Sequence, residues 1–195
     1  ALGTSVNPSV FGNSVTFTAT VTTTGGGFPV TTGSVTFRDG GASCATGTVI
    51  GTVAVNASGV ATQMTNALAA GSHTIRACYG GGGGFDPSSA SLLQNVDQAP
   101  QVITFGALVD KTYLDPPFLV SATGGGSGNP VTFTAVGNCT SGGVNGATIT
   151  ITGAGFCTVT ANQAGNANYL PATPVSRSFS INKAPQTITF GALSN

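Results

Sequence analysis

Residues 15–22 read VTFTATVT, and this stretch decides the fold class. Valine, phenylalanine and alanine alternate with threonine, so an extended chain here has one apolar face and one hydroxyl-bearing face. The same alternation recurs at residues 34–38, 131–136 and 157–161. A period of two residues predicts half-buried strands of antiparallel sheets. We therefore expect an all-β protein.

The composition supports a folded chain and excludes several functions. The 195 residues suit two domains of about 100 residues each. Hydrophobic residues reach 40%, which argues against disorder despite 30 glycines and 10 prolines. With five Lys and Arg in all and zero formal net charge, no basic stripe for nucleic acid can form.

The chain also lacks the signs of membrane insertion. No run of about 18 apolar residues occurs, and the first residues, ALGT, lack the layout of an uncleaved signal peptide. We expect a soluble mature product or an excised piece of a longer protein.

The first half of the chain is divided into short strands by turn residues. Expected strands cover residues 15–21, 35–37, 49–55, 60–64, 71–79 and 91–96. The glycine run at 80–84 is followed by no helix, so we interpret it as a flexible hairpin connection and not as a phosphate loop. About seven short strands in under 100 residues predict an immunoglobulin-like sandwich.

A second unit begins near Gln98. Its expected strands are 102–105, 118–122, 131–136, 147–152, 157–161 and 176–181. Residues 99–108, APQVITFGAL, recur at 184–193 as APQTITFGAL, an offset of 85 residues that suits one sandwich per repeat. The fold expectation is two tandem immunoglobulin-like β-sandwiches, 1–97 and 98–182, joined by a short linker, with 183–195 as the first strand of a further repeat or a donor-strand tail.

Several segments resemble the bacterial Ig-like repeats of large secreted and surface proteins. The matching stretches are 7–19, 33–40 and 70–75 in the first unit and 103–108, 157–161 and 164–169 in the second. The resemblance implies an extracellular stalk, spacer or adhesion module, and such folds serve many functions. Two departures are the extra residues 42–48 of the first unit and the glycine-rich residues 141–143 of the second.

The four cysteines predict two disulfides in an oxidising compartment outside the cytoplasm. The sequence contains no Cys-x-x-Cys pair, so the cysteine spacing does not favour a zinc site. We expect Cys139 to close one strand and Cys157 to open another, both in phase with the apolar faces of their strands. These two strands are antiparallel neighbours in an Ig-like sandwich, so we expect the two cysteines to bond. Cys44 and Cys78 then pair mainly by elimination. Cys78 is out of phase with the core face of its strand, so the inserted loop would have to fold back along the outer face.

Catalysis finds little support. His73 is the only histidine, without a nucleophile motif nearby, and we expect it to make a turn hydrogen bond. Lys111 between Asp110 and Asp115 could suggest an isopeptide bond, but we favour a solvated turn. We expect no enzyme, no cofactor and no metal. A structural calcium ion stays a minor alternative, with Asp86, Asp97, Asp110 and Asp115 as the isolated carboxylates.

Our first functional hypothesis is a non-catalytic module that extends or assembles a surface object, with neighbouring repeats or copies of itself as partners. The C-terminal copy of the repeat either marks a fragment cut just inside the next repeat or donates a strand to another subunit, building a head-to-tail filament. The possible donor residues are Thr187, Ile188, Thr189, Phe190, Gly191, Ala192 and Leu193.

The alternative hypothesis is an adhesin that binds a carbohydrate or a host or surface protein receptor. Sugar platforms normally expose aromatic rings, yet Trp is absent and only three tyrosines occur, Tyr79, Tyr113 and Tyr169. We expect Tyr79 to be internal.

Overall fold

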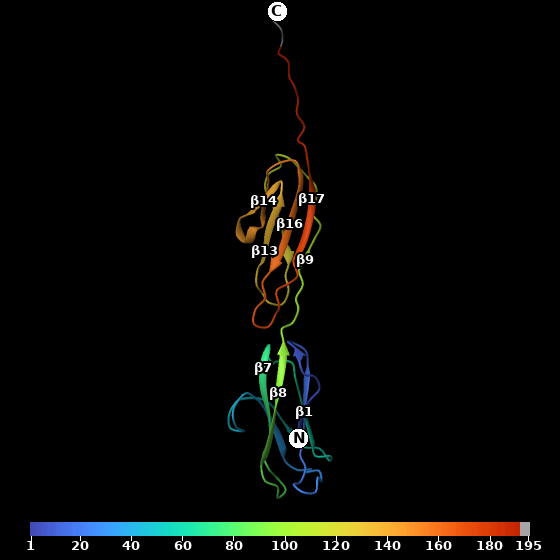
Figure 1. Cartoon of the computed structure of the whole chain (residues 1–195), viewed down its shortest axis with the longest axis vertical. Helices are drawn as coiled ribbons and strands as arrows, with labels where there is room; N and C mark the ends of the chain where they lie inside the picture. The colour runs from blue at the N-terminus through green and yellow to red at the C-terminus, as the bar shows by residue number, and fades with distance from the viewer. Residues whose placement is uncertain (192–195) are drawn as a thin grey trace, which may run out of the picture. The chain divides into compact units, whose positions relative to one another are not determined.

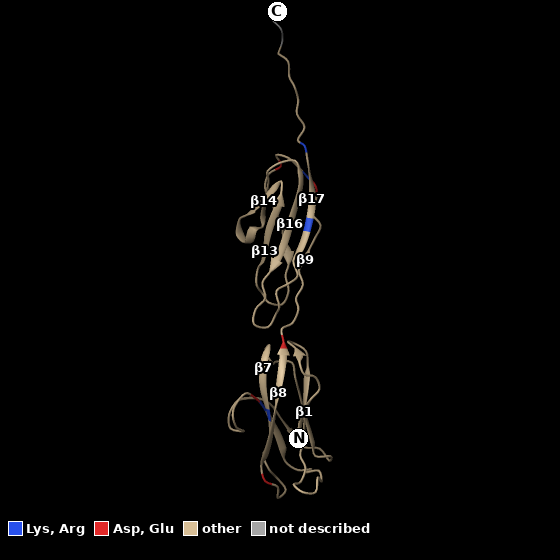
Figure 2. Cartoon of the chain, in the orientation of Figure 1, with Lys and Arg blue, Asp and Glu red and all other residues tan. Residues whose placement is uncertain are grey.

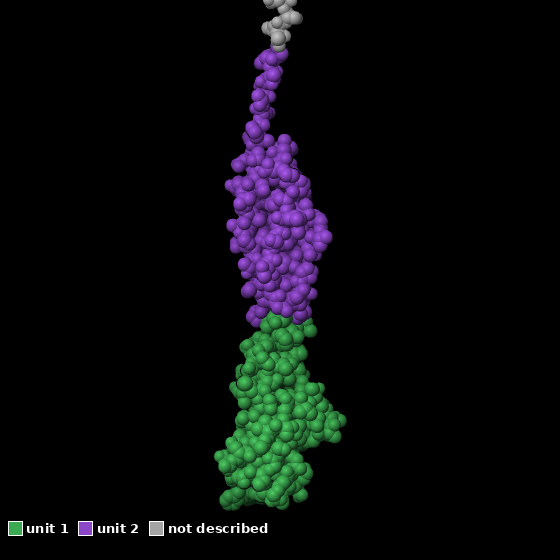
Figure 3. Space-filling model, turned by 180° about the vertical axis from the view of Figure 1, so that it is seen from behind, with its two compact units in different colours: residues 1–99, 167–169 green, residues 100–166, 170–195 purple. Residues whose placement is uncertain are grey.

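The computed structural model of the chain describes residues 1–191, and among these it contains strands and one short 3₁₀ turn, η1 (Val144–Gly146). The contacts divide the chain into two compact units. Unit 1 holds residues 1–99 and 167–169, and unit 2 holds 100–166 and the residues from 170 onward (Figure 3).

Unit 1 consists of two sheets (Figure 1). The smaller sheet has the order β1-β3-β6, formed by β1 (Leu2–Thr4), β3 (Val15–Thr20) and β6 (Val60–Thr65). The larger sheet has the order β2-β8-β7-β4-β5, formed by β2 (Ser9–Val10), β8 (Ser88–Asp97), β7 (Gly71–Tyr79), β4 (Ser34–Asp39) and β5 (Thr48–Ala54).

The core of unit 1 lies between the inner faces of these sheets. Strand β3 alternates strictly between buried and half-buried residues, which confirms the period read from its sequence. Phe17 of β3 and Phe37 of β4 are fully buried, as is Ile75 of β7. Their threonine and arginine neighbours face outward because successive side chains of a strand point to opposite faces.

The glycine run links β7 to β8 as a hairpin, as predicted. The Gly82 N–H donates to the Phe85 carbonyl at 3.2 Å, and the Phe85 N–H donates back to the Gly82 carbonyl at 3.1 Å. Between them Gly83 and Gly84 have φ angles of 60° and 89°. Two consecutive residues with positive φ are typical of a type I′ turn, the tight hairpin turn for which glycine is best suited.

Unit 2 has a four-stranded sheet and two smaller ones. The order β10-β17-β16-β13 is formed by β10 (Lys111–Thr112), β17 (Val175–Asn182), β16 (Gly155–Gln163) and β13 (Val131–Gly137). A second sheet has the order β11-β15-β14, formed by β11 (Phe118–Leu119), β15 (Thr148–Ile151) and β14 (Cys139–Gly142). The last pairs β12 (Ala122–Thr123) with β9 (Thr104–Phe105).

Each unit begins with two short strands that follow each other in the chain and belong to different sheets. In unit 1, β1 pairs antiparallel with β3 and β2 then pairs parallel with β8. In unit 2, β9 pairs antiparallel with β12 and β10 then pairs parallel with β17. The sequence did not predict β1, β2, β10 or β14, and the predicted strand at 118–122 is divided between β11 and β12. Strands of two to four residues show too few alternations to reveal a period.

The architecture is therefore all-β, with two tandem immunoglobulin-like β-sandwiches. Among residues 1–191 there is no helix with the length and apolar character needed to cross a bilayer.

Candidate functional site

The structure joins Cys139 and Cys157 through a buried disulfide. Their Cα atoms are 5.7 Å apart, and the two residues are 4% and 0% exposed. The predicted position of Cys139 is wrong in one respect, because it opens β14 instead of closing β13. Gly137, the last residue of β13, pairs with Cys157 of β16, and the chain then moves to the other sheet at Asn138. The bond consequently joins two sheets across the core of unit 2, and closing this loop contributes about 3 kcal/mol to stability.

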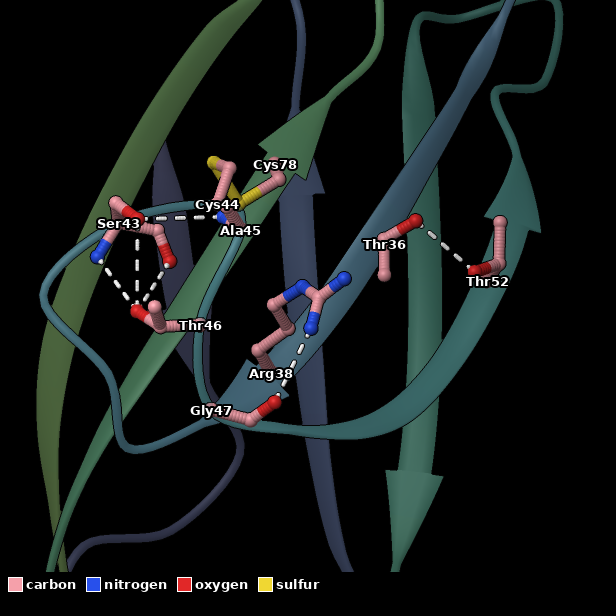
Figure 4. Close-up of a disulfide and its surroundings, with 9 residues drawn as sticks. All are labelled: Thr36, Arg38, Ser43, Cys44, Ala45, Thr46, Gly47, Thr52 and Cys78. Atoms are coloured by element: carbon pink, nitrogen blue, oxygen red, sulfur yellow. Dashed lines mark hydrogen bonds between the residues drawn. A yellow bond between two sulfur atoms is a disulfide. The ribbon is translucent and has the colours of Figure 1, made fainter.

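Cys44 and Cys78 are also bonded, with Cα atoms 5.7 Å apart. Cys78 lies on the outer face of β7, in register with Thr36 of β4. The loop between β4 and β5 folds back over that face to reach it, as Figure 4 shows. Within the loop, the Thr46 N–H donates to the Ser43 carbonyl at 3.3 Å. The covering loop leaves Cys78 only 7% exposed, although it points away from the core.

His73 makes two polar contacts at one end of the larger sheet of unit 1, where β4 ends and β7 begins. Its Nδ1 lies 2.8 Å from Oδ2 of Asp39, and its Nε2 lies 2.8 Å from the Ala69 carbonyl oxygen. No serine or cysteine nucleophile is hydrogen-bonded to the ring. The Nδ1 contact holds the start of β7 to the end of β4, and the Nε2 contact holds the residues that precede β7. This arrangement matches the structural role that the sequence favours.

The carboxylates of unit 2 serve as hydrogen-bond acceptors for the backbone. Asp110 accepts the Ser180 N–H at 2.7 Å, and Asp115 accepts the Thr112 N–H at 2.8 Å. The Lys111 ammonium lies 4.8 Å from the centre of the Phe118 ring. Within residues 1–191 no three His, Cys, Asp or Glu side chains gather where they could hold a metal ion.

The tyrosines offer little of the aromatic platform that sugar binding would use. Tyr79 is 4% exposed, as predicted, and its hydroxyl donates to the Thr32 carbonyl at 2.9 Å. Tyr113 is 38% exposed. The Tyr169 and Phe11 rings form a T-shaped pair inside unit 1, with centroids 5.4 Å apart.

The two copies of the repeated segment occupy different environments. In the first copy Gln101, Ile103 and Phe105 are buried, and β9 forms within it. In the second copy residues 184–191 form no strand, and Ile188 and Phe190 are 85% and 92% exposed. The last two predicted donor residues, Ala192 and Leu193, lie outside the described residues.

One pair of charged residues is not revealed by any sequence pattern. Arg38 of β4 and Arg76 of β7 stand directly opposite each other on the outer face of the larger sheet of unit 1. Their spacing of 38 residues carries no signal, because only the register between β4 and β7 brings them together.

One comparison with known proteins bears on unit 1. The family model described as "Bacterial Ig-like domain (group 3)" matches residues 2–97. A comparison with curated proteins found no match.

Among solved structures, the chain is similar to the fibronectin(III)-like modules of Clostridium thermocellum CbhA, with 15% identity, 99% of this chain and 100% of that one covered, and a TM-score of 0.35. It is also similar to a C-terminal 282-residue fragment of intimin, solved in complex with the intimin-binding domain of its translocated receptor. That match has 14% identity, covers 93% and 64% of the two chains and has a TM-score of 0.40. Titin domains A168–A170 match at 13% identity over 93% and 65%, with a TM-score of 0.43.

These structural likenesses have low identity and low scores, so the family assignment depends on the sequence match over unit 1. Residues 2–97 of the chain therefore belong to the bacterial Ig-like domain family, group 3.

Proposed function

We propose that the chain is a non-catalytic structural module of an extracellular or cell-surface protein, in which segment 184–191 is the opening strand of a further Ig-like unit of the same type as unit 2. Two disulfides support an oxidising location, since such bonds persist mainly outside the reducing cytosol. The family of unit 1 supports a role in extending or spacing a surface protein.

The proposal rests mainly on the single position at which the two copies of the repeated segment differ. Residues 99–108 and 184–193 differ only where Val102 is replaced by Thr187. Val102 is 75% exposed in the folded copy, whereas Gln101, Ile103 and Phe105 are between 3% and 8% exposed. Every side chain that is buried in the folded copy is thus retained in the second, and the one change falls on the outward face.

The folded copy also indicates what would receive the segment. Phe105 pairs with Ala122 of β12, and its ring packs against Phe133 with centroids 5.5 Å apart. The side chain of Gln101 donates to the Ala164 carbonyl and accepts the Ser127 N–H, both at 3.0 Å. The receiving unit therefore needs an equivalent strand to pair with and equivalent partners for the glutamine.

Two routes would supply that unit. In the spacer route, the next unit of a longer chain folds around the segment. In the filament route, a second copy of this chain accepts it as a donated strand. The position beside β12 is already occupied by β9 in unit 2, so a donated strand would have to displace it. This competition favours the spacer route.

An extended chain tests the proposal directly. Residues 109–182 would be joined after Leu193, in place of residues 194–195, so that 184–193 could open a complete third unit. We expect amide protection at 187–191 from hydrogen exchange, and we expect it to disappear when Ile188→Asp and Phe190→Asp are introduced together. A third unit that leaves 187–191 unprotected would overturn the proposal.

The filament route has its own test in the chain as it stands. Electron microscopy would compare the chain with a variant lacking residues 184–195 and with the Ile188→Asp, Phe190→Asp double variant. Polymers that vanish in both variants would support donation. Polymers that survive the deletion, or an absence of polymers at all concentrations, would reject donation in favour of the spacer route.

A further inference from the structure

Two arginines stand side by side on the outer face of unit 1. Arg38 of β4 and Arg76 of β7 form a directly opposed antiparallel pair. They are two of only five Lys and Arg residues in the whole chain. Like charges directly opposite each other destabilise a sheet, because such pairs have Cβ atoms about 4.5–5.5 Å apart. Two of the few charged residues of this chain therefore lie side by side and carry the same charge.

The surrounding structure partly covers both side chains. Arg38 and Arg76 are half-buried, and the Nε atom of each is buried without a hydrogen-bond partner. The loop held down by the Cys44–Cys78 bond lies over this region, and Arg38 Nη1 donates to the Gly47 carbonyl at 3.1 Å (Figure 4). Covering an N–H group without a hydrogen-bond partner costs free energy, so an acceptor that bonded to these arginines would offset that cost.

No carboxylate neutralises the pair. Asp39 follows Arg38 in the sequence but points to the opposite face of the strand, where its Oδ2 lies 2.8 Å from His73 Nδ1. Throughout residues 1–191 this contact is the one ion pair, so neither guanidinium has an acidic partner within 4.0 Å. Figure 2 shows how few other charges unit 1 carries.

A hollow of about 390 Å³ adjoins Arg38 on the same face. It is bounded by the Cys44–Cys78 bridge and by the hydroxyl-bearing Thr36, Ser88 and Ser89. The volume is within the range of small-ligand sites, about 300–1,000 Å³. Guanidinium and hydroxyl groups offer many hydrogen-bond donors, and an arginine fork matches the geometry of a sulfate, phosphate or carboxylate.

We propose that this hollow binds an oxyanion, with Arg38 making the direct hydrogen bonds and Arg76 beside it adding positive charge. The Cys44–Cys78 bond holds the covering loop in place and so shapes one wall of the site. The inference concerns a binding site in unit 1 and does not depend on the spacer role proposed above. Its ligand is either a free inorganic anion or the same group carried on a glycan.

Calorimetric titration of the whole chain with inorganic sulfate tests the site. We expect Arg38→Gln to weaken sulfate binding about tenfold or more, since it removes charge-assisted hydrogen bonds. Arg76→Gln should weaken binding less. Lys183→Gln makes the same change of charge outside unit 1 and should leave the affinity unchanged.

Folding of each variant would be checked by circular dichroism, and Arg38→Lys provides a second probe that keeps the charge. An Arg38→Lys affinity between those of the native chain and Arg38→Gln supports fork-like recognition. Native sulfate affinity in a folded Arg38→Gln variant, or equal losses in Arg38→Gln and Lys183→Gln, would overturn the proposal. So would the absence of any sulfate binding at millimolar concentration.

A sulfated disaccharide and its desulfated counterpart distinguish the two sources of the anion. Tighter binding of the sulfated sugar than of inorganic sulfate, with loss on desulfation, identifies a glycan-borne group. Equal affinity for the sulfated sugar and inorganic sulfate identifies a site for the anion alone.

Discussion

Segments 99–106 and 184–191 have nearly the same sequence and opposite environments. Phe105 is 3% exposed and pairs with β12, whereas Phe190, its counterpart 85 residues later, is 92% exposed. The isolated sequence has the same strand propensity in both places. The difference shows that the segment becomes a strand only when a sheet edge and a core are present to receive it, because backbone pairing and apolar burial both come from the partner.

The comparison also separates two kinds of information in one short stretch. The positions that are buried in the folded copy specify a receiving core, and the position that differs faces solvent. Equivalent substitutions in the two copies should then have unequal effects on stability. The difference between the two effects should be smaller at positions that are more exposed in the first copy.

The largest difference is expected at the phenylalanine. Phe105→Ala should lower the free energy of unfolding of unit 2 by about 3–5 kcal/mol, because it removes a buried ring and leaves a cavity. Phe190→Ala should change it by less than about 0.5 kcal/mol, as expected for an exposed side chain. Urea unfolding followed by NMR signals of β16 would measure both.

The Phe190→Ala chain is the matched control, since it makes the same substitution in the same local sequence. A cost similar to that of Phe105→Ala would mean that the second copy packs against something within the chain. Small effects in both copies would mean that the segment contributes little to the core of unit 2, and the retained inward positions would then not indicate a receiving core.

The strands themselves show why much of the fold could be read from the sequence. The predicted strands 15–21 and 157–161 alternate over seven and five positions, and the structure buries the predicted face of each within β3 and β16. Cys139 shows the limit of this reasoning. Cys139 is buried, as its phase predicts. A period of two residues does not reveal where a chain leaves one sheet for another, as this chain does after Gly137.

The arginine pair shows a second limit. The alternation in β4 and β7 puts Arg38 and Arg76 on outer faces, yet nothing in either strand fixes which residue will stand opposite which. Register is set by turns and by packing of the whole sheet, and a slip of one residue would move every side chain to the other face. Clusters made of single residues from distant strands are therefore the features that sequence reasoning misses most readily.

A smaller difference is expected at the glutamine. Gln101→Ala should destabilise unit 2 by about 1–2 kcal/mol, because it leaves the N–H of the half-buried Ser127 without its acceptor. The Ala164 carbonyl loses less, since it also accepts from Ser127 Oγ and Asn129 Nδ2. Gln186→Ala should have no measurable effect in the present chain.

Thermal unfolding followed by circular dichroism would compare the Gln101 and Gln186 variants. In the extended chain with a complete third unit, Gln186→Ala should acquire a cost like that of Gln101→Ala. If the third unit folds and Gln186→Ala remains neutral, the glutamine does not have the same role in both copies.

The smallest effect is expected where the copies differ. Val102→Thr converts the first copy into the second, and it should change the stability of unit 2 by no more than about 0.5 kcal/mol, because Val102 is 75% exposed. Chemical denaturation of this variant against the native chain is sufficient. A near-neutral result would mean that the two segments are interchangeable in the site formed by β12 and its neighbours. Residues 184–191 would then be unpaired because no free site is present, and not because of their sequence. A loss of several kcal/mol would instead make Thr187 a barrier to docking in a unit of this type.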